Sequence, residues 1–178
     1  MKTTWVLLAS CAALYGCALG EPRRVVAEAV LDGWSSVSRV EGRRALERYG
    51  PPDEIEAGRL AWRDRAPFKR IVVWDQEPIY VSDGLDALIL HSVRYEVPAG
   101  RRELLERFSV KLIIDPGSGE LAVRSGSEET NLLLLNLADD LAMGRRDLPE
   151  ARQYMMSTVR ASASGRSSPY LEGLLFNP

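Results

Sequence analysis

Hydrophobic residues recur with two different periods along this chain, and the change between them separates predicted helices from predicted strands. Between Ser38 and Tyr49 the apolar positions follow helical spacing, and Ser38-x-x-Glu41 has the form of a capping box. Gly50 is expected to end this helix, because glycine readily adopts the left-handed conformation of a C-cap and two prolines follow it.

From residue 55 the period shortens to two, which is typical of strands with one buried face. The apolar positions of the predicted strands are Ile55, Leu60, Trp62, Ile71, Val73 and Ile79, followed by a longer strand over 85–97. A short helix is predicted over 101–108, and a hairpin is predicted around the turn sequence Asp115–Gly119.

Two helices are predicted on the C-terminal side. Ser127 is placed to cap the first, whose many leucines predict burial on more than one side, and Gly144 is expected to end it. Asp147-x-x-Glu150 is a capping box for the second. Its predicted inward stripe consists of Leu148, Ala151, Met155 and Val159. The short connection makes the two helices antiparallel neighbours.

These elements predict an α+β fold, with an antiparallel sheet covered on one face by helices and a C-terminal helical hairpin. The chain has 178 residues, which is enough for one hydrophobic core. The expected organisation is a signal peptide over 1–16, a tether over 17–35, a single domain over 36–163 and a tail over 164–178. For residues 21–34 the spacing of Val25, Val26, Ala29 and Val30 leaves the first turns of a helix as the alternative to a tether. The tail residues able to dock back are Tyr170, Leu171, Leu174, Leu175 and Phe176.

The N-terminal segment has the pattern of an export signal, with Lys2 before an apolar stretch too short to span a bilayer. Leu14-Tyr15-Gly16-Cys17 resembles a bacterial lipobox, in which the cysteine becomes the lipidated first residue of the mature protein. Ala18-Leu19-Gly20 fits an alternative cleavage after residue 20, which would discard Cys17 and leave a soluble periplasmic or secreted protein.

Composition limits the chemistry available to the exported part. The two cysteines are Cys11, inside the predicted signal, and Cys17, directly after it, so the folded part of the chain forms no disulfide or thiolate site. His91 is the single histidine, which excludes multi-histidine metal sites, and on an alternating strand we expect it to be a partly buried structural side chain. We assemble no Ser-His-Asp or Cys-His set from this sequence. We expect no catalytic residue, no metal and no cofactor. The net charge of −2 without a basic stripe predicts no nucleic-acid partner.

Three weaker groups of residues compete with structural explanations. The first group could supply oxygen ligands to a cation from one helix, with a solvated polar stripe as the alternative; it consists of Glu128, Glu129, Asn136, Asp139 and Asp140. The second group could act as general acid and base, with turn formation as the alternative reason for its aspartates; it consists of Glu77, Asp83 and Asp86. A binding surface for a protein or lipid partner is offered by Trp62, Phe68, Arg70 and Trp74, where core packing of the aromatics is the alternative.

Several motifs resemble an uncharacterised family of exported bacterial proteins. They are Tyr49-Gly50-Pro51-Pro52-Asp53-Glu54, Leu60-x-Trp62, Phe68-Lys69-Arg70 and Asn136-Leu137-Ala138-x-Asp140. Members of that family carry a central histidine-containing segment and a cysteine after a Gly-Glu strand, whereas this chain has no histidine over 77–86 and has Ser125 after the strand. The resemblance implies an exported protein and brings no established activity. The two departures from the family pattern argue against a metal or thiol role for this chain. A weaker similarity is to small lipoproteins of outer-membrane assembly.

The sequence leads us to expect a non-enzymatic lipoprotein of the bacterial cell envelope. Cys17 would be its lipidation site, and Ala18 after it favours the periplasmic leaflet of the outer membrane. The expected partner is an envelope protein or a lipid surface. Two alternatives remain at this point: a periplasmic small-ligand carrier, and a metal-dependent hydrolase using His91 and carboxylates near Asp139.

Overall fold

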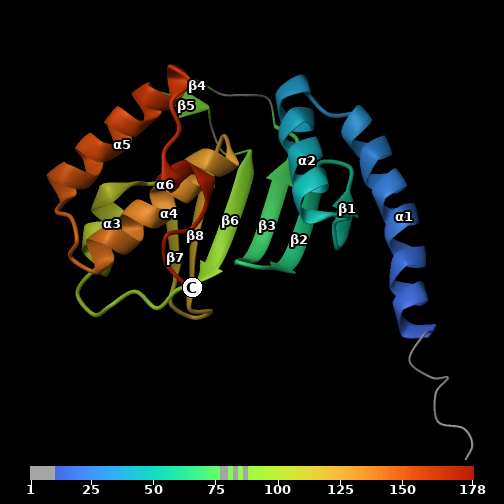
Figure 1. Cartoon of the computed structure of the whole chain (residues 1–178), viewed down its shortest axis with the longest axis horizontal. Coiled ribbons are helices and arrows are strands. Elements are labelled where there is room, and N and C mark those ends of the chain that lie inside the picture. Colours follow the sequence, from blue (N-terminus) through green and yellow to red (C-terminus); the bar gives the residue numbers. More distant parts are fainter. Residues whose placement is uncertain (1–10, 77–79, 82–83, 86–87) are drawn as a thin grey trace, which may run out of the picture.

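Alternating apolar residues build one antiparallel sheet, and amphipathic helices cover a single face of it (Figure 1). A computed structural model describes residues 11–76, 80–81, 84–85 and 88–178, without the side chains of 11–20, 80–81 and 84–85. The helices are α1 (Cys11–Asp32), α2 (Ser36–Tyr49), α3 (Arg102–Phe108), α4 (Glu128–Ala142), α5 (Leu148–Ala163) and α6 (Pro169–Glu172). This is the expected α+β class.

Six strands form the main sheet in the order β1-β2-β3-β6-β8-β7, with antiparallel neighbours throughout. The strands are β1 (Glu54–Glu56), β2 (Arg59–Arg65), β3 (Phe68–Trp74), β6 (Ile89–Arg94), β7 (Leu112–Asp115) and β8 (Glu120–Ser125). A separate pair consists of β4 (Tyr80–Val81) and β5 (Gly84–Leu85). The expected long strand over 85–97 is therefore divided between β5 and β6, while the predicted strand position Ile79 lies outside the described residues.

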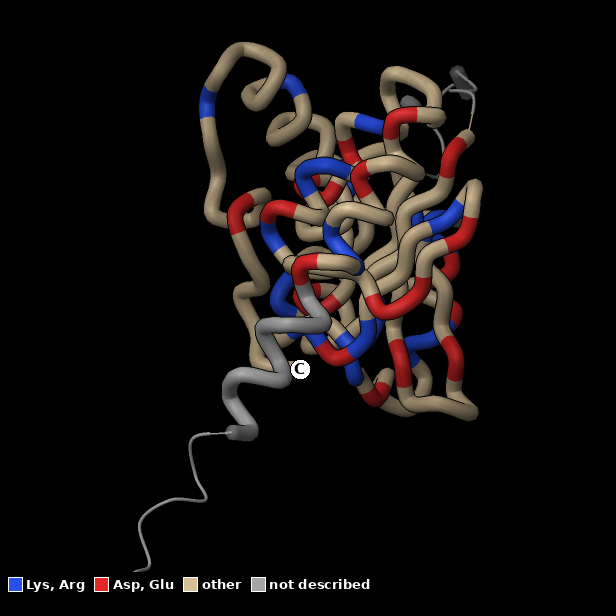
Figure 2. Tube along the Cα trace, turned by 90° about the vertical axis from the view of Figure 1, so that its right-hand side faces the viewer, with Lys and Arg blue, Asp and Glu red and all other residues tan. Residues whose placement is uncertain are grey.

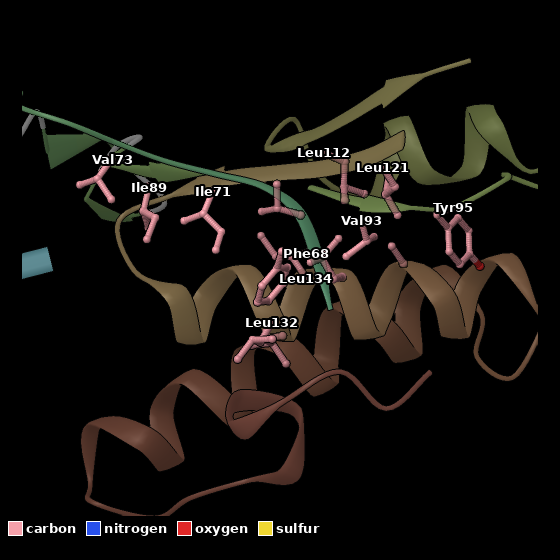
Figure 3. Packing of buried hydrophobic residues seen from close by; sticks show 14 of the residues in the cluster. Phe68, Ile71, Val73, Ile89, Val93, Tyr95, Leu112, Leu121, Leu132 and Leu134 are labelled. Atoms are coloured by element: carbon pink, nitrogen blue, oxygen red, sulfur yellow. The ribbon is translucent and has the colours of Figure 1, made fainter. Parts of the chain in front are cut away.

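The core fills the space between the sheet and α4 (Figure 3). Every residue of α4 from Asn131 to Ala142 is buried. The helix contacts β6 and β8 on one side and α3, α5 and α6 on its others, so its leucines meet apolar partners around the whole circumference. The expectation of burial on more than one side is confirmed.

Helix starts follow the predicted signals at two places and depart from them at a third. Asp147 and Glu150 form the capping box of α5, and Ser127 accepts a hydrogen bond from the amide of Thr130 at the start of α4. The capping box predicted at Ser38 is wrong, because α2 begins two residues earlier, at Ser36. The buried hydroxyl of Ser38 instead donates to the Gln76 carbonyl oxygen over 3.1 Å.

The inward face of α5 differs from the predicted stripe at its C-terminal end. Ala151 and Thr158 are buried, and Leu148 and Met155 are partly buried against the core. Val159 is 52% exposed, so its predicted inward position is wrong. Because 3.6 residues make a helical turn, the inward face has moved to Thr158 after two turns from Ala151.

The N-terminal boundary of the folded domain lies before Ser36. α1 packs along α2, with Ala27 and Leu31 fully buried and Trp34 nearly so. A Cβ at Gly42 of α2 would overlap Cδ2 of Leu31, so glycine allows this close approach. The tether expected over 17–35 is therefore wrong for its C-terminal half.

The C-terminal boundary lies beyond residue 163 for a similar reason. The side-chain amide of Asn136 on α4 donates to the carbonyl oxygens of Tyr170 and Gly173 and accepts from the amide of Leu175. The tail residues packed against the core are Tyr170, Leu171, Leu174 and Phe176, whereas Leu175 is 53% exposed. Docking of the tail is thus confirmed for four of the five residues considered.

Candidate functional site

His91 lies in the middle of β6 and is completely buried on the helix-covered face of the sheet. Its ring centroid is 4.5 Å from that of Phe68, and its Nδ1 is 2.9 Å from the side-chain nitrogen of Asn131. Its Nε2 is 3.4 Å from the hydroxyl of Tyr49. Both ring nitrogens therefore have a partner inside the domain.

The hydrogen bonds around Asn131 determine which nitrogen of His91 carries the proton. The Asn131 amide nitrogen donates to the Ile89 carbonyl oxygen over 2.9 Å, while its oxygen accepts from the Ser125 hydroxyl over 2.6 Å. Because the amide nitrogen only donates, Nδ1 of His91 accepts and the proton of the neutral ring is on Nε2. That proton points to the Tyr49 oxygen, and the Tyr49 hydroxyl donates to Glu128.

Burial sets the charge states of this polar chain. Burial, together with the nearby Arg48 guanidinium, lowers the pKa of His91 to about 3. Burial and the bond to the Glu128 carboxylate raise the pKa of Tyr49. Burial also raises the pKa of Glu128, against the opposing effects of the Tyr49 hydroxyl and of Arg48, which lies 3.3 Å away. A neutral imidazole and a tyrosine hydroxyl therefore connect the sheet to α2 and α4.

This geometry gives His91 a connecting role between the layers. A general base must reach a substrate proton directly or through one water molecule. His91 has no exposed surface, and its two nitrogens are engaged by Asn131 and Tyr49. The residues that the hydrolase hypothesis would bring together with it, near Asp139, bond instead to a different set of side chains.

Two arginines after α4 neutralise the acidic pair at its end. Arg145 bonds to both Asp139 and Asp140, and Arg146 donates to Asp140 over 2.9 Å. Tyr170 also donates to Asp140, over 2.7 Å. Burial alone would raise the pKa of Asp140, but the hydrogen bonds from Tyr170, Arg145 and Arg146 hold it below its usual value.

The neighbouring carboxylate is bound in the same way. The Tyr95 hydroxyl donates to Asp139 over 2.8 Å, and burial together with this bond raises the pKa of Tyr95. Three of the predicted oxygen ligands, Glu128, Asp139 and Asp140, thus bind tyrosines and arginines. Asn136 binds the C-terminal segment, and Glu129 is exposed. Over the part of the chain that the structure describes, no cluster of three or more His, Cys, Asp or Glu could hold a metal ion. Glu77, Asp83 and Asp86 lie outside that part.

The four residues predicted as a binding surface are divided between the two faces of the sheet. Trp62 is fully buried and Phe68 is 3% exposed, both in the core beneath the helices. Their assignment to a surface is wrong, because the helices α2 and α4 cover this face. Arg70 and Trp74 belong to the opposite face, where Trp74 packs partly buried against aliphatic residues.

The opposite face of the sheet, here called the open face, is covered by no described helix (Figure 2). Its floor consists of Ala61, Val72, Leu90 and Ala122, all less than one tenth exposed. By strand register, the arginines on this face are Arg59, Arg63, Arg70, Arg94 and Arg124. The Arg124 guanidinium lies 4.0 Å from the centroid of the Trp74 ring, a cation–π geometry.

Polar groups complete the open face. Ser92 is fully buried there, and its hydroxyl has no hydrogen-bond partner among the described residues. Arg70, opposite Ser92 in the register, lies 4.0 Å from Glu120. Sequence reasoning missed Arg124 and the apolar floor residues. The sequence signal for this face lay in the strand positions that alternate with the core residues, because an arginine occurs at such a position in each of β2, β3, β6 and β8.

Among the residues that the structure describes, no helix has the length and apolar character needed to cross a membrane. Cys17 lies within α1, whose backbone is described at that point. The sequence matches no protein-family model, and comparison with curated proteins and with solved structures gave no significant match.

Proposed function

We propose that this protein is an exported lipoprotein of the bacterial cell envelope that binds another envelope protein through its open face. The N-terminal signal pattern and the lipobox ending at Cys17 support export and anchoring on the periplasmic leaflet of the outer membrane. The observation that carries the binding role is the uncovered sheet face, with its apolar floor and arginine rim.

The composition of the open face supports a protein partner. Tryptophan and arginine are the residues that most often dominate binding energy at protein interfaces. Trp74 and Arg124 are stacked on one another, so part of the ordering cost of binding is already met within the free protein. Several arginines form ion pairs with acidic residues of the same face, including Arg59 with Glu54. A partner with a mixed polar surface and acidic groups suits this pattern.

The buried position of His91 supports a binding role over catalysis. The neutral imidazole is bonded at both nitrogens and stabilises the domain. The open face, in contrast, is covered by no described helix and is accessible to a partner. The acidic residues Asp139 and Asp140 are likewise engaged with Arg145 and Arg146.

In-cell photocrosslinking tests the binding surface. A photoreactive amino acid replaces Arg70, which is exposed on the open face, in a C-terminally tagged protein with its native signal. The matched control replaces Met156, which is 51% exposed on the outer side of α5. We expect one dominant envelope protein to be captured from position 70 and not from position 156, as identified by mass spectrometry.

Trp74→Ala gives the energetic test of the same surface. If Trp74 is a hot spot, its truncation weakens binding by about 2 kcal/mol or more, which is roughly 30-fold in affinity. Equal capture from both crosslinking positions, or capture unaffected by Trp74→Ala, contradicts the assignment of the open face.

Lipidation is tested separately. Cys17→Ser should abolish labelling with radioactive palmitate, and persistent labelling contradicts Cys17 as the acylated residue.

A further inference from the structure

Two contacts fix the direction of α1 relative to the sheet. Before β1, Nη1 of Arg23 donates to the Asp53 carbonyl oxygen over 2.8 Å. After β1, Nε1 of Trp34 donates to the Ala57 carbonyl oxygen over 2.6 Å. α1 therefore runs parallel to β1, and Ala27 between these two contacts is fully buried. The helix is attached to the domain from Arg23 onward.

The N-terminal part of α1 continues toward the end of the sheet where β2 turns into β3 (Figure 1). At 1.5 Å per residue, Cys17 lies about 9 Å beyond Arg23 along the helix. β2 runs antiparallel to β1 and so toward the same end. From Ala61, which accepts a hydrogen bond from the Asp53 amide, β2 extends about 16 Å to Ala66 at the strand rise of 3.3 Å.

The β2–β3 turn, Ala66–Pro67, thus reaches at least as far as Cys17 in the same direction. Even a fully extended chain from Cys17 to Arg23 could span at most about 22 Å. The length of β2 is similar, about 23 Å. An acyl group on Cys17 therefore holds Arg23, where α1 joins the domain, within about 22 Å of the acylated residue.

We propose that α1 is a rigid stalk that holds the β2–β3 turn against the headgroup layer of a phospholipid bilayer when Cys17 is acylated. This inference rests on the proposed lipidation. Ala66 and Pro67 are exposed, and the turn is flanked by Asp64 paired with Lys69. A charged, solvated turn suits the polar headgroup layer, which is roughly 5–8 Å thick on each side of the hydrocarbon core.

This orientation determines how the open face is presented. The strands extend away from the bilayer, so the plane of the sheet is roughly perpendicular to the membrane and the open face is accessible from the side. Its partner is then another protein at the same membrane surface, within reach of a domain whose distance from the lipid is fixed by α1.

Single-cysteine labelling tests the stalk, because Cys11 is removed with the signal and Cys17 is acylated, so an introduced thiol is the only free one. Ala66→Cys carries a fluorophore at the β2–β3 turn. The matched control is Gly58→Cys, an open position at the other end of β2. The acylated protein is reconstituted into phosphatidylethanolamine–phosphatidylglycerol vesicles containing a headgroup quencher. We expect the label at position 66 to lose most of its fluorescence and the label at position 58 to lose little.

A flexible Gly-Ser insertion after Gly20 should remove the difference between the two labels, since it detaches α1 from the acylated residue. Ser118→Cys, exposed in the β7–β8 turn at the same end of the sheet, replaces Ala66→Cys if that variant does not fold. Equal quenching at both ends of β2 in palmitate-labelled protein overturns the stalk and leaves the lipoprotein proposal intact. Absence of palmitate labelling overturns both.

Discussion

The side-chain amide of Asn131 on α4 lies 2.9 Å from Nδ1 of His91 on β6, and this contact joins the helix layer to the centre of the sheet. The same amide also bonds to Ile89 and Ser125, so one buried side chain satisfies polar groups from two strands. A buried polar group that loses its partner retains the full penalty of leaving water.

Replacing Asn131 with leucine should therefore destabilise the domain. The side chains have similar size, but the substitution leaves Nδ1 of His91 without its donor and removes a bond from Ser125. We expect a loss of about 2–4 kcal/mol in the free energy of unfolding, measured by urea titration. Glu129→Gln, on an exposed position of the same helix, should change the stability by less than about 0.5 kcal/mol. A neutral effect of Asn131→Leu contradicts the structural role of the network.

The buried imidazole predicts a pH dependence of stability. The pKa of His91 is about 3 in the folded protein and 6.5 for the ordinary side chain, so the unfolded state binds the extra proton first. Stability is therefore lost as the pH falls below about 6.5. Between pH 7.5 and 5.5 the loss from this group should be about 1.4 kcal/mol.

His91→Gln provides the comparison, because it removes the titrating group and leaves the raised pKa of Glu128 in both proteins. Urea midpoints at the two pH values should show the additional acid sensitivity in the natural chain alone. If the urea midpoint falls equally between the two pH values in both proteins, and His91→Gln is folded at pH 7.5, a lowered pKa of His91 is excluded.

Asn136 should control the docking of the C-terminal segment. Its side chain makes three hydrogen bonds to the backbone of residues 170–175, so Asn136→Ala removes them together. We expect faster proteolysis after residue 163 and faster hydrogen exchange at Leu175, with the sheet still protected. Asn177→Ala, at an exposed side chain of the same segment, should leave both rates unchanged. If the amides of the whole sheet exchange faster in Asn136→Ala as well, the C-terminal segment unfolds together with the sheet and the prediction of separate docking is contradicted.

The approach of α1 to α2 predicts a coupling between Gly42 and Leu31. Gly42→Ala adds a methyl group that overlaps Cδ2 of Leu31, so we expect a loss of about 1–2 kcal/mol despite the better helix propensity of alanine. Leu31→Ala alone should lose about 2–5 kcal/mol. The double variant should lose less than the sum by at least about 0.5 kcal/mol, because the smaller side chain makes room for the methyl group.

Gly33→Ala is the matched control for this cycle, since its added methyl meets only the Val30 carbonyl oxygen at an ordinary 3.5 Å. Thermal or urea unfolding of the four proteins measures the coupling. Strict additivity of the two substitutions contradicts the close contact between α1 and α2.

Local chemistry determined much of the fold. Gly50 ends α2 with a positive φ of 75°, Asp147 and Glu150 begin α5, and the turn after Asp115 joins β7 to β8. Each signal acts over a few residues, so it can be recognised without knowing what lies nearby in space. The same limitation explains the error at Ser38, whose hydroxyl bonds to Gln76 from a distant part of the chain.

The sequence by itself determined the α+β class, the two C-terminal helices and the residue types available for chemistry, because periodicity, caps and composition are local properties. Only the tertiary structure decided that Trp62 is interior while Trp74 lies on the open face, and that His91 meets Asn131 and Tyr49. Those outcomes depend on strand order and on which face the helices cover. Both follow from packing among segments far apart in the chain, which no short pattern of residues encodes.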